Sequence, residues 1–540
     1  MYGDDSGTSS TAQVAPRDLA ALNVREYLEE AARAAPDATF LIHGDESVSF
    51  AEFNRRVDMA AFAWYELGVR KGDRVAFMLE NRPEFLQAWL GLAKIGGILV
   101  AINTRWQASE VADFLSLTEP RFALTGEQFE EVFGSAAAGA GTLERTVSLG
   151  PSETFDDFSE RIRQSRSEAP AVDLTSGDLI SFISTSGTTG RPKAVMQTHG
   201  NYVLTGEGYA HWVELLSNER IYLCLPLFHI NSQAYTVMSA IAARASIVLV
   251  ERFSASAFWP DMVRYGVNVF NYIGSMLIVL MKREVTPEER EHAVRLTYGG
   301  PALPGPLRSE VEERFGLTLI SGIGMSETTF GLIESLHGQR RPGSLGKPRQ
   351  HPDPRIVNEA RVVDDAGNEV PDGATGELII RNPVLMRGYY RNPEQTAETI
   401  RGGWLYTGDL VRKDSDGFFY FVDRKKDVIR VRGENVSSAE VEQVLNEFPA
   451  VQEAAVVGVP SAMTEDDVAA FVVPRPGTVP DAEEIAAWCR TRLAAFKLPR
   501  YLWLVDSLPK TETQRVEKHR LRERARELIS LAESEGSIVP

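Results

Sequence analysis

Residues 184–193 (STSGTTGRPK) combine the residue types that bind phosphate groups, directly after the apolar residues 179–183. The glycines let the backbone turn sharply and point several N–H groups at one spot, which forms a nest for an anion. The serine and threonine hydroxyls add donors, and Lys193 adds a positive charge. The G-x-x-x-x-G-K-[ST] pattern of a Walker A loop is absent. A flexible surface loop is the alternative, but the composition of all ten residues favours a cradle for phosphates.

Further short motifs follow in order along the chain, namely residues 226–230 (PLFHI), 298–302 (YGGPA), 322–328 (GIGMSET), 404–409 (WLYTGD) and 423–427 (DRKKD). Two of them carry carboxylates with a definite chemical use. Glu327 is a ligand type that suits a hard cation, and the two oxygens of Asp409 can accept hydrogen bonds from two hydroxyls. Taken singly, each motif also has a structural interpretation, as a strand-end turn, a capped turn or a charged surface turn.

With these motifs the chain resembles the superfamily of adenylate-forming enzymes, which includes acyl-CoA synthetases, luciferases and the adenylation domains of peptide synthetases. The resemblance extends from about residue 24 to residue 522. Residues 226–230, 418–424 and 433–437 resemble most the crotonobetaine/carnitine-CoA ligase-like branch. The resemblance implies a carboxylic acid–CoA ligase that activates its acid with ATP and Mg²⁺, releases pyrophosphate, and then rotates a small C-terminal domain. CoA then takes the acyl group from the adenylate, and AMP leaves.

The resemblance also implies the site residues. The nucleotide would contact Thr185, Ser186, Gly187, Thr188, Thr189, Gly190, Lys193, Gly300, Pro301, Ala302, Gly322, Ile323, Gly324, Ser326, Asp409 and Arg424. Catalytic roles would fall to Lys193, His229, Glu327 and Arg515, with the metal on Glu327. The acyl pocket would include His229, Tyr272, Gly274, Ser275 and Phe330. Lys426 would be the hinge, and Arg432 and Gly433 would lie beside CoA. A lone histidine such as His229 can also be a satisfied core residue.

Several positions depart from the pattern of the superfamily. Ile323 stands where an aromatic residue usually stacks on adenine, which removes a stacking contribution of about 1 kcal/mol. Arg432 replaces a glycine. Arg515 stands in place of the catalytic lysine of the C-terminal domain and keeps the charge, although arginine and lysine are not interchangeable at a tight site. Lys518 is an alternative donor if the loop shifts.

These departures leave other functions open. One alternative is an adenylate-forming enzyme with another acceptor, either an amine, a carrier protein, or an arylamine attacking activated nitrite in a diazotisation. Another is a degenerate relative that binds a nucleotide without turnover. The identity of the acid is not readable from the sequence, although the pocket residues suggest a small or medium-sized acid, including aromatic ones.

The elements that position these motifs follow two patterns. Helical and strand patterns alternate over residues 24–103 and again over 179–336, which predicts parallel sheets flanked by helices. From residue 361 short strands and close turns predict an antiparallel, barrel-like part. We therefore expect an α/β fold with three parts: a disordered leader (1–20), an N-terminal adenylation domain (21–423), and a small, mobile α+β C-terminal lid domain (424–540).

Composition limits the class of protein. The net charge of the 540-residue chain is −18, which disfavours binding of a nucleic-acid backbone. The two cysteines, Cys224 and Cys489, are far apart and exclude a disulfide scaffold or a cysteine zinc site, which fits a reducing cytoplasm. No apolar run approaches the roughly 20 residues of a membrane span. The expected partner is a small acid, and a homodimer is left open.

Overall fold

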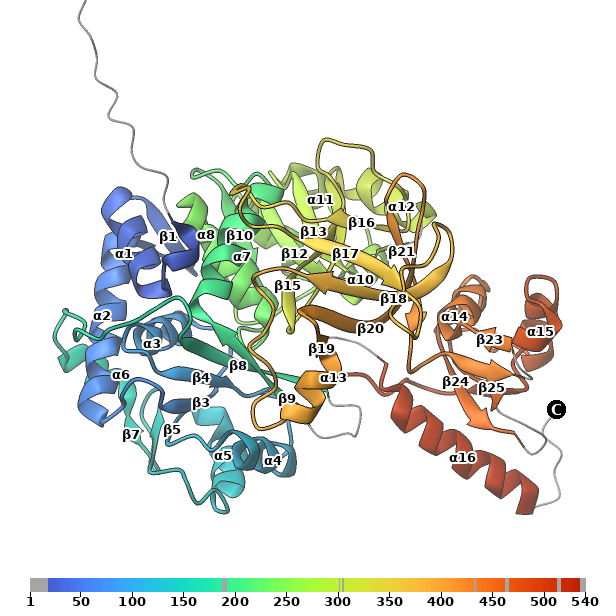
Figure 1. Cartoon of the computed structure of the whole chain (residues 1–540), viewed down its shortest axis with the longest axis horizontal. Coiled ribbons are helices and arrows are strands. Elements are labelled where there is room, and N and C mark those ends of the chain that lie inside the picture. The colour runs from blue at the N-terminus through green and yellow to red at the C-terminus, as the bar shows by residue number, and fades with distance from the viewer. Residues whose placement is uncertain are drawn as a thin grey trace, which may run out of the picture.

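The computed structural model describes residues 18–186, 192–300, 302–303, 305–431, 434–461, 466–511 and 516–534. A large N-terminal part carries two sheets, and a smaller C-terminal domain follows it (Figure 1). Residues 1–17, most of the predicted leader, lie outside the described residues. The described chain opens with a 3₁₀-helix, η1 (Leu19–Ala21), whose Leu19 packs against the main core.

The first sheet has seven strands in the order β7-β6-β5-β3-β4-β8-β9. These are β3 (Arg74–Met78), β4 (Ile98–Ala101), β5 (Phe122–Thr125), β6 (Arg145–Ser148), β7 (Asp156–Asp157), β8 (Leu179–Ser186) and β9 (Pro192–Thr198). All its pairings are parallel except that of β8 with β9, which form a hairpin. The same region holds α1 (Val24–Ala34), α2 (Phe50–Leu67), α3 (Pro83–Lys94), α4 (Ala108–Thr118), η2 (Glu127–Phe129), α5 (Glu130–Ala137) and α6 (Phe158–Gln164).

The second sheet has fourteen strands and changes from parallel to antiparallel along its width. Its mainly parallel part contains β1 (Thr39–His43), β2 (Glu46–Ser49), β10 (Arg220–Leu223), β11 (Ser246–Leu249), β12 (Val269–Ile273), β13 (Leu296–Gly300) and β14 (Thr318–Met325). Its antiparallel part contains β15 (Thr328–Ile333), β16 (Ser344–Pro348), β17 (Glu359–Val363), β18 (Thr375–Arg381), β19 (Ile400–Arg401), β20 (Trp404–Lys413) and β21 (Phe419–Arg424). Among the described strands the antiparallel part continues the sheet and ends at β17, so these pairings do not close a separate barrel.

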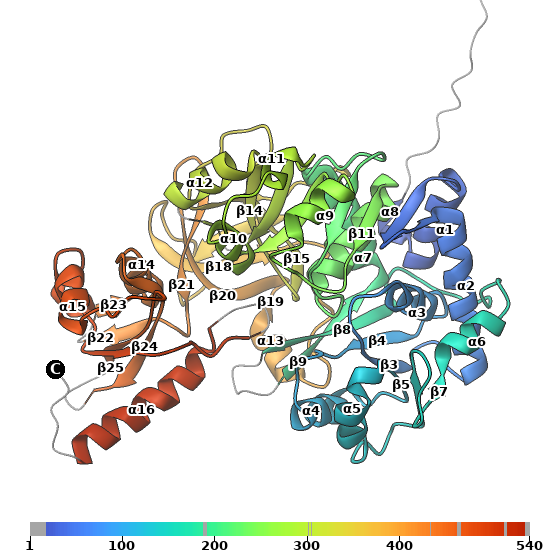
Figure 2. The same ribbon diagram turned by 180° about the vertical axis from the view of Figure 1, so that it is seen from behind.

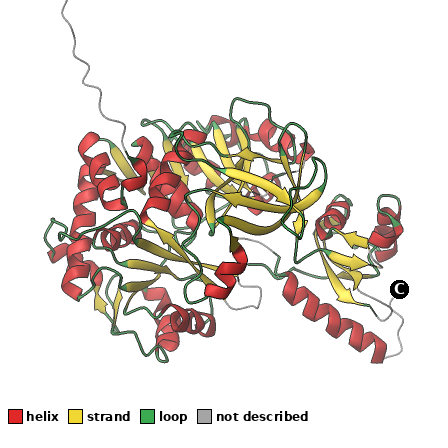
Figure 3. Ribbon diagram, in the orientation of Figure 1, coloured by secondary structure: helices red, strands yellow, loops and turns green. Residues whose placement is uncertain are grey.

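Helices pack against this second sheet (Figures 1 and 3). They are α7 (His199–Trp212), the π-helix η3 (Asn231–Val237), α8 (Met238–Ala243), α9 (Phe258–Arg264), α10 (Gly274–Met281), α11 (Glu288–Glu291), α12 (Gly305–Phe315) and α13 (Pro393–Thr399). The parallel strands β10, β13 and β14 end at residues 223, 300 and 325, and the motifs 226–230, 298–302 and 322–328 lie at or directly after these ends. Ligands of open α/β sheets bind at such carboxyl ends, so the fold gathers the motifs at one edge.

The described part of the C-terminal domain has two small sheets, β22-β23 and β24-β25-β26, and three α-helices. It contains β22 (Ile429–Val431), β23 (Glu434–Val436), α14 (Ser438–Asn446), β24 (Val451–Pro460), β25 (Asp466–Pro474), α15 (Ala482–Arg490), η4 (Ala495–Lys497), β26 (Tyr501–Leu504) and α16 (Lys518–Ser534). Figure 2 shows from behind that α16 runs along one side of this domain. The domain buries its own apolar clusters, so it has a separate core.

Residue types at the ends of several helices explain where these helices begin and end. Asn23 caps α1 with a capping box to Glu26, and Gly68 ends α2 in the left-handed region at φ 105°. Ser437 caps α14 by accepting from the Glu440 amide. Helix α15 begins at its cap Asp481 and ends at Arg490, before η4.

Candidate active site

The hairpin of β8 and β9 positions Lys193. Thr185 pairs with Lys193 and Ser186 with Pro192, so the two strands bring both ends of the predicted phosphate loop together. Gly187, Thr188, Thr189 and Gly190 lie outside the described residues, as does the side chain of Ser186. Lys193 is thus held at the start of a strand beside the loop that the sequence predicts to bind phosphates.

A second segment brings Tyr389 next to Lys193. Tyr389 forms a bridge with Val195, and the amide of Tyr390 donates to the carbonyl of Ala194 at 2.9 Å. Lys193 Nζ stands 4.6 Å from the centroid of the Tyr389 ring. The Tyr389 hydroxyl donates a hydrogen bond to Glu327 Oε1 at 2.8 Å. Tyr389 therefore connects two residues that the sequence predicts to be catalytic.

The charges around Lys193 oppose one another. Burial lowers the pKa of Lys193, the Glu327 carboxylate acts in the opposite direction, and the positive charge of Lys426 lowers it further. Lys426 of the predicted hinge is thus close enough to act on Lys193. The pKa of the Tyr389 phenol is raised by burial and then by the Glu327 carboxylate, so Tyr389 remains a hydrogen-bond donor. An anion bound here would neutralise the positive charges of Lys193 and Lys426.

Glu327 meets the requirements of a ligand for a phosphate-bound cation. It lies half-buried in the turn between β14 and β15, beside Lys193. Among the described residues no group of three or more His, Cys, Asp or Glu side chains could hold a metal ion by itself. Mg²⁺ commonly uses one or two carboxylates together with substrate phosphates, so a single carboxylate at this place fits such an ion.

The ends of β13 and β14 meet closely enough to require glycines. A Cβ on Gly300 would lie 2.9 Å from the carbonyl oxygen of Gly322, and a Cβ on Gly324 would lie 2.2 Å from the Tyr235 hydroxyl. Ala302 and Ile323 pack against one apolar cluster, which gives the predicted base site an aliphatic wall. The side-chain amide of Gln197 donates a hydrogen bond to the backbone oxygen of Ser326. Pro301 lies outside the described residues.

Asp409 and Arg424, the two predicted ribose contacts, are paired. They face each other across β20 and β21, and Arg424 Nε lies 2.6 Å from Asp409 Oδ1. Asp409 is fully buried, so a half-exposed guanidinium neutralises an otherwise costly charge. The amide of Lys425 donates to Gly408 at 2.9 Å. The predicted hinge therefore begins directly beside the predicted ribose site.

Beyond the hinge, side-chain bonds attach α14 and α16 to it. Asp423 accepts from the Ser438 amide at 2.6 Å, and Arg522 donates to Asp427 at 2.7 Å. Lys518 binds Glu442 at 2.8 Å and the Ser438 hydroxyl at 2.6 Å. Lys518 is thus occupied within the C-terminal domain. Arg432, Gly433 and Arg515 lie outside the described residues.

The C-terminal domain also approaches the end of α10. Lys282 directly follows that helix. Burial lowers the pKa of Lys282, and the charges of Arg475, Glu453 and Lys510 also affect this pKa. Lys510 forms an ion pair with Glu453 at 2.5 Å and an isolated bridge with Val516. The described chain on both sides of residues 512–515 is therefore anchored in a part of the domain that lies near the large domain.

Two of the predicted acyl-pocket residues lie in different apolar clusters. Tyr272 is buried in one of them, and a Cβ on Gly299 would lie 2.1 Å from its backbone oxygen. Phe330 belongs to the other cluster, where its ring contacts the Trp212 ring at 5.1 Å. Gly274 starts α10, whereas the side chain of Ser275 is outside the description.

His229, the remaining predicted acyl-pocket residue, is uncharged near neutral pH. Burial, and then the nearby charge of Arg105, lowers its pKa to about 4. Its Nε2 atom is buried and has no hydrogen-bond partner among the described residues. A neutral imidazole with an open nitrogen is available to a bound ligand, and the role of His229 in the acyl site stays a prediction.

Sequence reasoning missed two residues of this region. Residues 386–390 (MRGYY) match the superfamily, but we read them as structural, and the spacing alone does not reveal that Tyr389 reaches Glu327. Arg349 directly follows β16 and belongs to no motif of the sequence, yet it is fully buried next to Tyr298. Only the three-dimensional arrangement identifies both.

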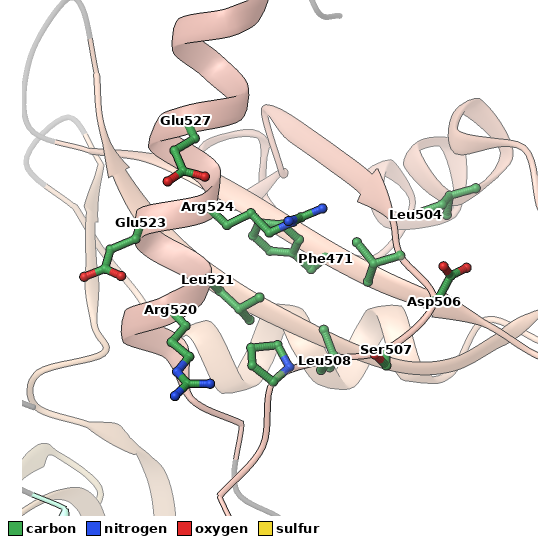
Figure 4. Close-up of a pocket in the computed structure, with 12 residues that line it drawn as sticks. Phe471, Leu504, Asp506, Ser507, Leu508, Arg520, Leu521, Glu523, Arg524 and Glu527 are labelled. Carbon is green, nitrogen blue, oxygen red and sulfur yellow. The ribbon is translucent and has the colours of Figure 1, made fainter. Parts of the chain in front are cut away.

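A hollow of about 640 Å³ lies elsewhere, in the C-terminal domain between α16 and the segment after β26 (Figure 4). Charged side chains of α16, including Arg520, Glu523 and Arg524, surround it, and Phe471 and Leu521 supply its apolar part. None of the predicted site residues lines it. We therefore assign the candidate site to the motif residues at the sheet edge.

Comparisons with known proteins identify the family of the chain. The family model described as "AMP-binding enzyme" matches residues 28–390, and "AMP-binding enzyme C-terminal domain" matches residues 440–515. A crotonobetaine/carnitine–CoA ligase of Salmonella paratyphi A is 34% identical over 517 residues, which cover 93% of this chain and 99% of that protein.

Solved structures agree in fold. The anthranilate CoA ligase AuaEII in complex with anthranoyl-AMP has a TM-score of 0.86 and 28% identity, covering 94% of this chain and 98% of that one. ATP-bound MatB from Rhodopseudomonas palustris has a TM-score of 0.85 and 26% identity, covering 93% and 99%. No helix in the described part of the chain is both long and apolar enough to cross a membrane.

Proposed function

Because this chain belongs to the family of AMP-binding enzymes and is an adenylate-forming ligase of the acyl-CoA synthetase type, we propose that it joins a small or medium-sized carboxylic acid to CoA. Aromatic acids are the first candidates. The rings of Tyr272, Phe330 and Trp212 near the predicted acyl pocket support this class, as does the likeness to an anthranilate CoA ligase.

In the first half-reaction a carboxylate oxygen of the acid attacks the α-phosphorus of ATP. A P–O bond forms, the bond to the β-phosphate oxygen breaks, and pyrophosphate leaves. No general base is needed because a carboxylic acid is already ionised at neutral pH. Lys193 stabilises negative charge on the phosphates, and Asp409 with Arg424 orients the ribose.

Glu327 would hold Mg²⁺ against the phosphates, and the ion would supply further neutralisation of their charge. Tyr389 orients the Glu327 carboxylate through its hydroxyl and supports Lys193 through its ring. The resemblance to the superfamily assigns to Arg515 the role of the catalytic lysine, which is to stabilise the charge on the phosphates. These roles rest on the proximity of Lys193, Tyr389, Glu327 and Lys426.

In the second half-reaction the C-terminal domain rotates about Lys426, and the CoA thiol reaches the acyl-adenylate. The sulfur attacks the acyl carbonyl carbon, a thioester forms, the thiol proton goes to solvent, and AMP leaves. A cytoplasmic setting suits such an enzyme, because Cys224 and Cys489 are buried as free thiols.

The observation that carries the proposal is the contact series Lys193–Tyr389–Glu327 next to the phosphate loop. ATP–pyrophosphate exchange, measured over a panel of aliphatic and aromatic acids and with nitrite, tests it. We expect exchange that depends on one class of carboxylic acid, and thioester formation when CoA is added. Exchange with nitrite alone, or adenylate formation that only an amine or a carrier protein consumes, would contradict the proposal.

A further inference from the structure

Arg349, the residue directly after β16, has a fully buried side chain at 0% exposure. Its guanidinium has five N–H donors, and each has an acceptor. The acceptors are the carbonyl oxygens of Leu332 (3.2 Å), Thr329 (3.1 Å) and Ile323 (3.3 Å) and the hydroxyls of Tyr235 (3.2 Å) and Tyr298. All five acceptors are neutral, so the hydrogen bonds leave the positive charge in place.

No carboxylate among the described residues lies within ion-pair distance of Arg349. A second buried arginine offers a direct contrast, since Arg308 binds both oxygens of the buried Glu334 at 2.7 and 2.9 Å. Around Arg349 stand aromatic rings, those of Trp212 at 4.8 Å, Tyr298 at 5.0 Å and Tyr235 at 5.3 Å. Such rings attract a cation but do not cancel its charge.

The charge lies beside Phe330, one of the predicted acyl-pocket residues, and beside the predicted nucleotide residues at the end of β14. A Cβ on Gly322 would be 3.1 Å from Arg349 Nη2 and 3.0 Å from the Tyr298 ring. Trp212, whose ring faces the guanidinium, contacts Phe330. Tyr272 pairs with Gly299 rather than with Tyr298, so its ring lies on the opposite face of the sheet. Arg349 thus acts on the predicted pocket from the face that carries Phe330.

We propose that Arg349 sets the charge class of the acid: the pocket accepts acids whose tail is neutral or negative and excludes acids whose tail is cationic. The inference rests on the proposed function and specifies its substrate class. Because all five donors are already used, Arg349 acts on the substrate through its charge rather than through a direct bond. It is a specificity-determining residue and not a catalytic one.

The expected size of the effect follows from Coulomb's law. Two like charges about 8 Å apart, at an effective dielectric constant of about 20, repel each other enough to weaken binding on the order of thirtyfold. Crotonobetaine and carnitine each carry a quaternary ammonium group. The inference therefore separates this chain, in substrate, from the crotonobetaine/carnitine–CoA ligases that it resembles in sequence.

The test uses a matched pair of stable acyl-adenylate mimics, acylsulfamoyl adenosines. One carries a butanoyl chain ending in trimethylammonium, and the other carries its all-carbon isostere, in which tert-butyl replaces trimethylammonium. The shared adenosine anchors both, so calorimetric Kd values isolate the effect of the tail charge. We expect the neutral mimic to bind the wild-type protein about thirtyfold more tightly. Arg349→Lys should preserve that ratio, and Arg349→Met should bring it close to one.

Arg340→Met is the matched control, because Arg340 is a half-buried arginine already paired with Glu312 at 2.9 Å; the ratio should not change. Equal Kd values in the wild-type protein would overturn the inference even if every Arg349 variant failed to fold. An unchanged ratio in folded Arg349→Met would overturn it as well. If neither mimic binds, the adenylate site itself is absent and the proposed function fails.

Discussion

The hydroxyl of Tyr389 donates to Glu327 Oε1 at 2.8 Å, and this bond joins a segment before α13 to the turn between β14 and β15. The ammonium group of Lys193 lies over the ring of the same tyrosine. One side chain therefore orients an anion and a cation, which are the two charges that a metal–nucleotide complex needs at its phosphates.

The two contacts of Tyr389 can be separated by mutation. Tyr389→Phe keeps the ring under Lys193 but removes the bond to Glu327, and a hydrogen bond to a charged group contributes about 1.5–3 kcal/mol. We expect kcat/KM for ATP in the exchange assay to fall roughly tenfold or more. Tyr389→Leu also removes the ring, so kcat/KM for ATP should fall further in this variant because the cation–π contact is lost as well. Equal activities of the two variants would contradict a role for the ring.

Lys193→Ala removes a charge next to the phosphate loop. We expect a loss of about 1–3 kcal/mol in adenylation at subsaturating ATP, the contribution of a charge-assisted hydrogen bond. ATP–pyrophosphate exchange measures it. Lys71→Ala is the control, because Lys71 pairs with Asp178 on the surface at 2.8 Å and should leave the rate unchanged. An unaltered exchange rate in Lys193→Ala would exclude its contact with phosphate.

Glu327→Gln replaces a hard carboxylate by a neutral amide, which is a poorer ligand for a small dication. The half-saturating concentration of free Mg²⁺ should rise, while saturating Mg²⁺ restores part of the activity. The control is Glu398→Gln. The Glu398 carboxylate also raises the pKa of Lys193, but Glu398 lies on α13 and is not a predicted metal ligand. If the Mg²⁺ dependence of Glu327→Gln matches that of the wild type, Glu327 is not at the metal.

Much of this arrangement was predictable because it depends on local sequence. The cap at Asn23, the end of α2 at Gly68 and the alternation of helices and strands follow from residue type and spacing. The parallel strands then bring the motifs at the ends of β10, β13 and β14 to one edge. The coarse position of the site follows from these rules.

Other features depend on contacts between distant residues and were not predictable. Lys193 and Tyr389 are separated by almost two hundred positions, and their contact requires the pairing of Val195 with Tyr389. The same holds for Arg349, whose side chain is buried among residues of the five separate elements β13, β14, β15, η3 and α7. A sequence pattern shows what a residue can do, whereas the partner that it meets depends on the complete fold.

His199 makes stability depend on pH. It is fully buried, its Nδ1 accepts from the Val24 amide at 3.2 Å, and burial lowers its pKa from 6.5 to about 4. As pH falls, the unfolded chain binds the proton first, so stability is constant above pH 6.5 and declines between pH 6.5 and 4. Between pH 7 and 5 this histidine alone accounts for about 2 kcal/mol.

Urea unfolding of the N-terminal domain at several pH values measures this decline. His199→Gln cannot be protonated and should show a shallower loss between pH 6.5 and 4, after an offset for the changed contact with Val24. His337→Gln is the control, because His337 is exposed beside Glu214 and should keep the wild-type slope. A slope that His199→Gln leaves unchanged would exclude His199 as its source.

The last prediction distinguishes Arg515 from Lys518. Lys518 is bound to Glu442 and to the Ser438 hydroxyl, so it serves the packing of α16 on the C-terminal domain. Arg515→Ala should therefore depress the adenylation half-reaction severely and leave thioester formation from pre-made acyl-adenylate nearly intact. Arg515→Lys should retain or raise activity, because the smaller ammonium fits the same ion site. Lys518→Ala leaves the charge of Glu442 in a mostly buried place, which lowers the thermal stability of the C-terminal domain and slows both half-reactions together. Rates of the two half-reactions, measured separately for each variant, decide the assignment. If Lys518→Ala abolishes adenylation alone while Arg515→Ala has no effect, the catalytic cation is Lys518 and α16 must leave Glu442 during turnover.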